Sequence, residues 1–398
     1  MYTKRSNMRL DEAKNLHLEH IEDEIINAGA DGVSAVRDYM LGLLSLLDGT
    51  ETQSKLTVKW DGAPAVICGI NPKNNRFFIG TKSVFAQRSK AAYTPTQIRQ
   101  YYEGNLGNKL ENAFIYLKRL GIKGVLQGDL LFDDDIKQTA GDVITFQPNT
   151  IVYRVEKGSE LFEQINRARL GIAFHTTYVG DTLADMDAQF GADISGFRKS
   201  ADVWVDDATI KNVSGTVTMT KEEQLNVKLA IKQLNPESVD GAVWQAMKMN
   251  SEFINSFKLF INSQIKKGVG VTKPNTIINQ FATFYRNKKE KEMAGLKMDK
   301  AKQTRIEQIR NQLNFLKTYK DGLTKMLAMY NQTIKAKNII LNKLKNIQKI
   351  GTFNRTDKGL EVTDPEGFVA INAQGNAVKL VDRLNFSRTN LTTQKNWK

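Results

Sequence analysis

The sequence has very little cysteine: Cys68 is the only one among 398 residues. A single thiol excludes an intrachain disulfide and a thiolate-rich zinc site, and it is typical of a reducing compartment. No apolar stretch approaches the length that crosses a membrane, and residues 1–24 lack the apolar segment of a secretory signal. These absences predict a cytoplasmic protein with no membrane partner.

The common phosphate-handling and ester-handling motifs are also absent. The sequence contains no Walker A loop, no G-x-G-x-x-G and no serine nucleophile elbow. Histidine occurs three times. His17 and His20 are spaced for one helix face, but no third ligand is in view, which favours a solvated or interface face over a metal site. Any phosphate chemistry therefore falls to lysine and arginine.

Positive charge is concentrated in one segment. Residues 241–350 hold 22 Lys and Arg against 6 Asp and Glu, from totals of 57 and 43, so the rest of the chain is near neutral with 35 against 37. This surplus predicts a polyanion partner, RNA or DNA ahead of a membrane surface. A lysine-rich solvated helix face is the alternative.

The pattern of residues changes along the chain, and it predicts an α+β fold. Residues 1–50 indicate a pair of helices that end at Gly29 and Gly49. Residues 51–219 carry short β-branched and aromatic runs separated by turn residues, which predict mainly antiparallel strands. One helical stretch is expected within them, near "ENAFIYLKRLG".

Residues 220–350 are helical in pattern. Apolar residues recur every three or four positions from Ile306 to Leu344, which predicts a helical hairpin or coiled-coil-like arm, with a bend expected at Asp321-Gly322. Whether such an arm joins two copies of the chain is left open. Strand-like runs return in residues 351–398 and are too few to fold alone, so they are expected to complete the sheet begun before residue 219. The helical block is then an insertion.

One short motif suggests a chemistry. "KWDG", from Lys59 to Gly62, follows a strand-like run, and taken alone it is compatible with an ordinary hairpin turn. It gains weight from later stretches in a fixed order. These are "LQGDLLF" (126–132), "IAFHTTYVG" (172–180), "EGFVAI" (366–371) and "AVKLVDR" (377–383).

In these motifs the sequence resembles the covalent nucleotidyltransferase superfamily of ATP-dependent DNA ligases, RNA ligases and mRNA capping enzymes. The resemblance covers residues 51–219 and 351–386. As a whole, the chain also looks like tailed-bacteriophage proteins with the same Lys-Trp-Asp-Gly signature, for which the expected location is the host cytoplasm. The resemblance implies an antiparallel-sheet, ligase-like core with N-terminal helices and a long helical insertion.

The resemblance also implies roles for individual residues. Lys59 would attack the α-phosphate of ATP and expel pyrophosphate, and Lys379 would hold that phosphate. Glu366, with Asp129, would bind Mg²⁺. Nucleotide-binding roles are implied for Asp61, Gly62, Asp129, Phe174, Lys82 and Arg383. Four of these residues have a plain structural alternative. Lys59 could be an ordinary hairpin lysine, Glu366 an acid beside a turn, Asp129 a solvated carboxylate, and Phe174 a core aromatic that does not stack on the base.

The sequence departs from the superfamily pattern in several places. Asp129 stands where Glu is usual, and Val381 stands where a second lysine is usual. Thr57 and Val58 precede the motif in place of an adenine-reading Glu, so ATP rather than GTP is a default. Few residues follow Lys379, too few for the OB-fold domain of DNA ligases. This favours an RNA-ligase-like or divergent enzyme.

The expected function is an ATP-dependent polynucleotide ligase for RNA or nicked DNA that works through lysyl-AMP. Residues 241–350 would grip the nucleic acid. Two alternatives remain open: a non-catalytic nucleic-acid-binding or structural phage protein with this fold, and a nucleotidyltransferase that modifies a protein or small molecule.

Overall fold

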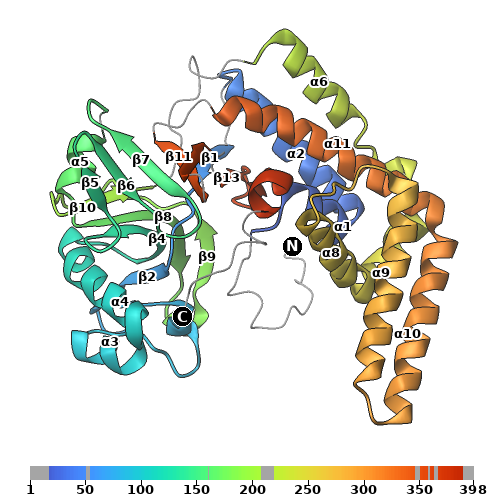
Figure 1. Cartoon of the computed structure of the whole chain (residues 1–398), viewed down its shortest axis with the longest axis horizontal. Helices are drawn as coiled ribbons and strands as arrows, with labels where there is room; N and C mark the ends of the chain where they lie inside the picture. Colours follow the sequence, from blue (N-terminus) through green and yellow to red (C-terminus); the bar gives the residue numbers. More distant parts are fainter. Residues whose placement is uncertain are drawn as a thin grey trace. The chain divides into compact units, whose positions relative to one another are not determined.

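The computed structural model (Figure 1) is mixed helix and sheet, 52% helical and 20% strand, which confirms the α+β class. It describes residues 18–50, 54–159, 161–207, 219–345, 350–356, 359–362 and 366–388. The chain divides into two compact units. The first contains Lys55–Asn212 and Ile347–Ala377, and the second contains Glu19–Ser54, Val213–Asn346 and Val378–Lys398.

A six-stranded sheet forms the centre of the first unit. Its strands run in the order β10-β8-β4-β2-β3, and β9 also pairs with β8. All of these pairs are antiparallel except β10 with β8, which is parallel. The bounds are β2 Ala65–Ile70, β3 Phe77–Gly80, β4 Val125–Asp133, β8 Leu170–Val179, β9 Asp187–Phe190 and β10 Val203–Asp206.

Side chains alternate between the two faces of each strand, and a buried cluster covers each face of this sheet. One face packs under helices α3 (Pro95–Tyr101) and α4 (Gly104–Leu117) in a cluster that contains Val66, Leu126 and Phe174. The other face carries a second cluster that contains Ile67, Val125 and Tyr178. Helix α4 covers the "ENAFIYL" stretch that the sequence predicts to be helical. The unit also contains α5 (Phe162–Arg167) and the short turns η2 (Lys82–Phe85), η3 (Lys118–Leu120) and η4 (Leu183–Asp185).

A five-stranded sheet of order β12-β11-β7-β6-β5 belongs to the same unit. Strand β11 pairs antiparallel with β7, with Phe353 opposite Val152, so chain from both sides of the helical segment meets in one sheet. The bounds are β5 Gln138–Ala140, β6 Val143–Phe146, β7 Val152–Glu156, β11 Gly351–Thr356 and β12 Gly359–Val362. Within the regions predicted to form strands, residues 208–218 and 363–365 lie outside the described residues.

Strands β1 (Lys55–Lys59) and β13 (Gly367–Ile371) form another antiparallel pair of the first unit. The register places Lys55 opposite Ile371 and Lys59 opposite Gly367. This pairing again joins the two ends of the interrupted unit. Because β1 ends at Lys59 and β13 begins opposite it at Gly367, the pairing places Lys59 beside the residue that precedes β13.

The second unit is helical. Its elements are η1 Ile21–Asp23, α1 Glu24–Ala28, α2 Ala30–Leu47, α6 Lys221–Lys232, η5 Pro236–Ser238, α7 Gly241–Met249, α8 Ser251–Lys266, α9 Pro274–Ala294, α10 Asp299–Thr318, α11 Lys320–Leu344 and the π-helix η7 Arg383–Ser387. Strand β14 (Ala377–Leu380) is the stretch where the chain passes from the first unit to the second. Within the described part of the chain, no helix is both long and apolar enough to cross a membrane.

The N-terminal helices and the helical segment share this unit, whereas the sequence suggested separate parts at residues 1–50 and 220–350. Helix α1 ends against Gly29, whose φ of +62° is one that glycine adopts readily, and α2 ends just before Gly49. Both glycines therefore lie where the sequence predicts helix ends. The part of the first expected helix that precedes residue 18 lies outside the described residues.

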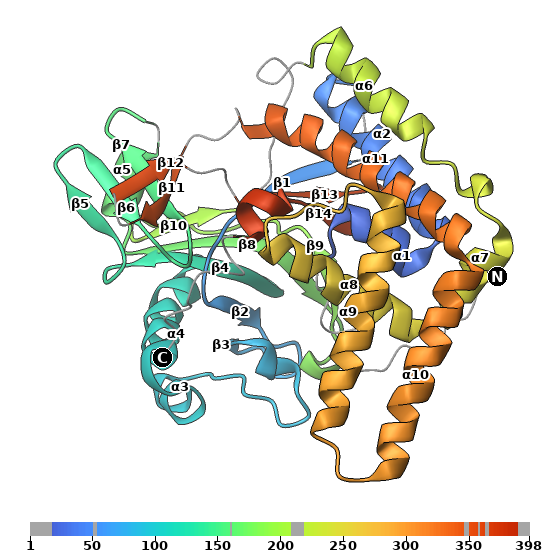
Figure 2. The ribbon, with the colours of Figure 1, turned by 45° about the vertical axis from the view of Figure 1, so that its right-hand side comes forward.

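The apolar stripe from Ile306 to Leu344 covers two helices with different surroundings. Helix α10 lies alongside α9 in an antiparallel hairpin, as Figure 2 shows, and Ile306 on it is 39% exposed. Helix α11 packs against α6, α9 and α2, and its apolar face is buried along its length. The break falls at Tyr319 and not at Asp321-Gly322, because α11 already begins at Lys320. The hairpin is thus α9 with α10, while α11 is a core helix.

Candidate functional site

Lys59 and Glu366 are brought together by the β1–β13 pair. Lys59 is the last residue of β1 and lies opposite Gly367, and Glu366 directly precedes β13. Lys59 Nζ donates a hydrogen bond to Glu366 Oε1, across 307 positions of sequence. The two side chains are 24% and 11% exposed, so the pair is largely desolvated but remains open on one side.

The amine lies among more than one carboxylate. Burial disfavours the charged form of Lys59, but the negative charges of Glu366, Asp129 and Asp61 outweigh this effect and raise the pKa of Lys59. Burial raises the pKa of Glu366 to about 7; Lys59 opposes this rise, and Asp61 and Asp129 add to it. The centre therefore carries more negative than positive charge, an imbalance that a bound cation would relieve.

The donor set suits Mg²⁺ better than a metal held by protein side chains alone. Among the described residues, no group of three or more His, Cys, Asp or Glu side chains could hold a metal ion. Mg²⁺ needs only one or two carboxylates, because it keeps several waters and binds substrate phosphates. Glu366 and Asp129 supply carboxylate oxygens of this kind. Burial is the main cause of the raised pKa of Glu366, and the negative charges of Asp61 and Asp129, which such an ion would help to neutralise, add to it.

Asp61 has a positioning role and is not available to a nucleotide. Its carboxylate accepts hydrogen bonds from Asn149 Nδ2 at 2.7 Å and from the N–H groups of Thr150 and Ile151 at 2.6 and 2.8 Å. Its own N–H donates to Tyr153 Oη at 2.8 Å. Asp61 is 3% exposed. The expectation that it contacts the nucleotide is corrected: it ties the loop after Lys59 to the turn between β6 and β7.

Trp60, a residue without a predicted role, anchors the same loop. Its indole Nε1 donates to Asp206 Oδ2 at 2.8 Å. Its ring packs against Tyr153, with ring centroids 5.1 Å apart, and against the edge of Trp204 at 5.8 Å. These contacts hold the residue after Lys59 between β7 and β10. A tryptophan within a Lys-x-Asp-Gly motif is the signal that could have indicated an aromatic anchor.

Gly62 allows the loop to contact β4. A Cβ at this position would lie 2.6 Å from Asp129 Cβ and 3.0 Å from the Leu130 carbonyl oxygen, closer than real Cβ atoms approach. The next residue donates its N–H to Leu130 O at 2.8 Å, and Leu130 N–H donates to Pro64 O at 3.1 Å. Gly62 therefore acts by lacking a side chain, and the close contact brings Asp129 to the loop that follows Lys59.

Asp129 faces His175, a residue to which the sequence assigns no role. His175 Nε2 lies 3.5 Å from Asp129 Oδ2, and His175 Nδ1 lies 2.8 Å from Thr176 Oγ1. The β4–β8 register shifts at this point, since Gln127 pairs with Thr176 and the next residue, Gly128, pairs with Phe174. His175 is thus the extra residue of a β-bulge, a feature that re-aims side chains.

Phe174 is fully buried and cannot stack on a base. It has 0% exposure in the cluster under α3 and α4, and it packs edge-on against Phe197 with ring centroids 5.6 Å apart. The expectation of a base-stacking Phe174 is corrected. Phe174 and His175 lie on opposite sides of β8: the core is on the side of Phe174, and Asp129 is on the side of His175.

Lys82 is exposed in η2, the turn that follows β3, and takes no part in the contacts around Lys59. Lys379 belongs to the second unit, where its N–H donates to Glu19 O at 2.8 Å and its backbone bridges to His20. Its proposed role at the α-phosphate stays a prediction.

Arg383 is part of a buried ion network in the second unit. Its guanidinium donates to Asp23 Oδ1 at 3.0 Å and to Asn262 Oδ1 at 2.7 Å, and Tyr330 Oη donates to the same Asp23 oxygen at 3.0 Å. Burial opposes the charged form, but Asp23 and its neighbours raise the pKa of Arg383. The expectation that Arg383 contacts phosphate is corrected, because the side chain is buried and both of its terminal nitrogens donate inside the unit.

Comparison with known proteins gives one match. The model of a family of unknown function, DUF6267, matches residues 15–395. No curated protein and no solved structure matches the chain.

Proposed function

We propose that this chain, which belongs to the DUF6267 family, is an ATP-dependent polynucleotide ligase with a nucleotidyltransferase core and a lysyl-AMP intermediate. The observation that carries the proposal is the hydrogen-bonded Lys59–Glu366 pair. The motif that contains Lys59 and the motif that contains Glu366 are far apart in sequence but meet there, and the negative charge of Asp129 also acts on Lys59. The proposal also rests on the order of the motifs, which resembles that of the superfamily.

In the first step Lys59 Nζ attacks the α-phosphorus of ATP. A phosphorus–nitrogen bond forms while the bond to the pyrophosphate oxygen breaks. The amine must first lose a proton. Glu366 is its hydrogen-bond partner, and with a pKa of about 7 it is a stronger base than an ordinary carboxylate. Glu366 therefore takes the proton in this proposal. Mg²⁺, when bound near Glu366 and Asp129, would neutralise the phosphate charge.

The surrounding residues hold this amine in place. Asp61 and Trp60 anchor the loop after Lys59 to β7 and β10, and Gly62 lets it approach β4. The reactive nitrogen is thus fixed before a nucleotide arrives, which reduces the entropic cost of the reaction. The AMP then moves to a 5′-phosphate, and a 3′-hydroxyl displaces it to seal the strand.

The nucleic acid would contact the basic helical segment. Lys289 and Lys337 do not contribute, because both are buried in ion pairs. Exposed lysines remain where α9 joins α10, at Lys291, Lys297 and Lys300. Binding to phosphate at such positions releases counterions, so affinity should fall steeply as salt concentration rises.

The test is formation of a covalent adduct. The purified chain is incubated with Mg²⁺ and α-labelled ATP or GTP, and protein-bound label that is acid-labile and alkali-stable is measured. We expect label from ATP in the wild type and none in Lys59→Ala. Lys55→Ala is the matched control, because Lys55 is an exposed lysine on the same strand. Its labelling should equal that of the wild type.

The fate of the label separates the alternatives. Discharge by a nicked duplex or by 5′-phosphorylated RNA supports a ligase and identifies its substrate. If neither nucleic acid discharges the adduct, the result supports an enzyme that modifies a protein or small molecule. If neither nucleotide labels the wild type, the proposal is wrong, and a non-catalytic nucleic-acid-binding protein becomes the better account.

A further inference from the structure

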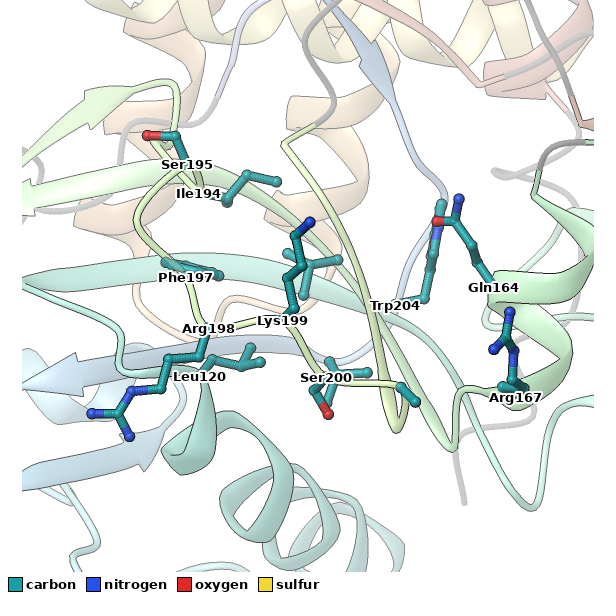
Figure 3. A pocket seen from close by; sticks show the side chains of 13 residues that line it. Leu120, Gln164, Arg167, Ile194, Ser195, Phe197, Arg198, Lys199, Ser200 and Trp204 are labelled. Carbon is teal, nitrogen blue, oxygen red and sulfur yellow. The ribbon is translucent and has the colours of Figure 1, made fainter.

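A cavity lies in the first unit, beside β10, and its lining residues do not include Lys59. It has a volume of about 680 Å³. Cavities of roughly 300–1,000 Å³ are typical of sites for nucleotide-sized ligands. Figure 3 shows its wall, which comes from α5, from residues 194–201 and from β10. None of the lining residues takes part in the contacts around Lys59 except Trp204, which touches Trp60.

The charged side chains of the wall have one sign. Arg167, Arg198 and Lys199 line the cavity, and no Asp or Glu does. None of the three forms an ion pair with a carboxylate among the residues that the structure describes. In the view of Figure 3, Lys199 and Arg167 lie on either side of Trp204, while Arg198 points away from both. The cavity therefore favours an anion held between Lys199 and Arg167.

The rest of the wall is apolar, and two of its rings are fixed from behind. Trp204 stacks on Phe132, with ring centroids 6.3 Å apart and 19° between the planes. Phe197 packs edge-on against Phe174 at 5.6 Å. Rings held in this way are preorganised, so a planar ligand group would not have to order them. Ser195 and Ser200 add hydroxyl groups at the rim.

We propose that this cavity binds a nucleotide unit with a terminal phosphate. The phosphate lies between Lys199 and Arg167, and the base or sugar packs on the apolar wall formed by Trp204 and its neighbours. The unit is either a free nucleoside monophosphate or the phosphorylated end of a strand, because both present the same groups. The site goes beyond the proposed adenylation at Lys59 and does not require it.

Strand β10 links the cavity to the loop after Lys59. Trp204 lines the cavity, and two residues later Asp206 accepts the hydrogen bond from Trp60. The rings of Trp60 and Trp204 lie 5.8 Å apart. A ligand against Trp204 should therefore change tryptophan fluorescence, which provides a direct readout of binding.

The test is a fluorescence titration of the full chain with four probes: 5′-AMP, adenosine, a 5′-phosphorylated oligonucleotide and its 5′-hydroxyl counterpart. We expect each phosphorylated probe to bind about tenfold or more tightly than its unphosphorylated partner, as expected for a charge-assisted contact. The double variant Arg167→Gln/Lys199→Gln should lose this preference. Lys123→Gln is the control, because Lys123 is an exposed lysine of the same unit outside the cavity wall.

Several outcomes would overturn the site. These are no binding of any probe, equal binding of phosphorylated and unphosphorylated probes, or binding that survives the double variant but is lost in Glu366→Gln. The last result would mean that the probe occupies the Lys59 centre. Preference for 5′-AMP alone identifies a free nucleotide, and preference for the oligonucleotide identifies a strand end. Adduct formation is measured separately in the double variant, where it should persist, so failure of either proposal can be recognised.

Discussion

Two ion-pair centres, one in each unit, join residues that are distant in sequence, and they differ in charge balance and exposure. In the second unit, Lys337 donates to Glu22 at 2.7 Å and Arg383 donates to Asp23 at 3.0 Å, with all four side chains at most 7% exposed. Two positive charges thus meet two negative charges away from water. In the first unit, Lys59 is 24% exposed.

The first-unit centre is not balanced. Lys59 contributes one positive charge, and its partner Glu366 one negative charge. Asp129 and Asp61 add further negative charge, which shifts the pKa values of both Lys59 and Glu366. A buried network with equal positive and negative charge has no surplus charge for a ligand to neutralise. A centre with surplus charge and an open side is suited to bind something else. We therefore interpret Lys337–Glu22 as structural and Lys59–Glu366 as functional.

The largest effect on stability is expected from breaking the balanced network. Lys337→Met removes the hydrogen-bonded cation of the buried Glu22 and leaves only Arg383 at 3.9 Å, which should lower the free energy of unfolding of the second unit by about 3–5 kcal/mol. Urea denaturation measures the loss. Lys335→Met, an exposed lysine on the same helix, is the control and should cost less than about 1 kcal/mol. Equal stability of Lys337→Met and Lys335→Met would contradict a stabilising role of this ion network in the second unit.

A smaller effect, with a defined pH dependence, is expected at the unbalanced centre. In the folded chain the pKa of Glu366 is raised from 4.5 to about 7, so the folded state binds more protons than the unfolded state in this interval. The contribution of Glu366 to stability is therefore complete below pH 4.5 and is lost as the pH rises through about 7. Glu366→Gln should remove a decrease of roughly 2–3 kcal/mol between pH 5 and 8.

The comparison for this prediction is the difference in unfolding free energy between wild type and variant, measured at several pH values. Other raised carboxyls, such as Asp23, cancel in that difference. Glu156→Gln is the control, since Glu156 is 69% exposed and should give a flat difference. A flat difference for Glu366→Gln as well would mean that the pKa of Glu366 is not raised by folding.

The smallest of these effects is expected at Asp61. Asp61→Asn keeps the shape of the side chain but removes its charge and replaces one acceptor oxygen by an NH2 group, which weakens the hydrogen bonds to the turn at residues 149–151. The expected cost is about 1–3 kcal/mol of stability. Labelling by ATP should fall too, because the loop after Lys59 is less well held. Asp142→Asn, at a residue 73% exposed, should change neither quantity. Normal labelling in Asp61→Asn would argue against the positioning role.

Local patterns in the sequence predicted much of the fold. The glycines at positions 29 and 49 indicated helix ends, and the return of strand-like runs after residue 350 indicated strands that join the earlier part of the chain. The α+β class followed from these patterns. The assignment of residues 19–50 to the helical unit could not be predicted, because it depends on contacts between helices far apart in sequence.

The sequence predicted site residues correctly only where the order and spacing of the motifs indicated them. The motifs selected Lys59 and Glu366, which the β1–β13 register brings together. The choice between Phe174 and His175 depends on which face of β8 is core and on a bulge in the β4–β8 register, and one sequence does not reveal either feature. The prediction that Arg383 contacts phosphate was wrong because its partner, Asp23, lies in an acidic stretch with the composition of an exposed helix. Asp61 was misjudged because its partners are mainly backbone N–H groups.

The most direct test of the central claim is to locate the nucleotide on the protein. The wild-type chain is incubated with ATP and Mg²⁺ and digested under alkaline conditions, and the peptides are sequenced by mass spectrometry. We predict a single modified peptide that contains the sequence KWDG, with AMP on Lys59. AMP found on another lysine, or on no peptide while Lys59 is recovered unmodified, would contradict the claim that this amine is the nucleophile.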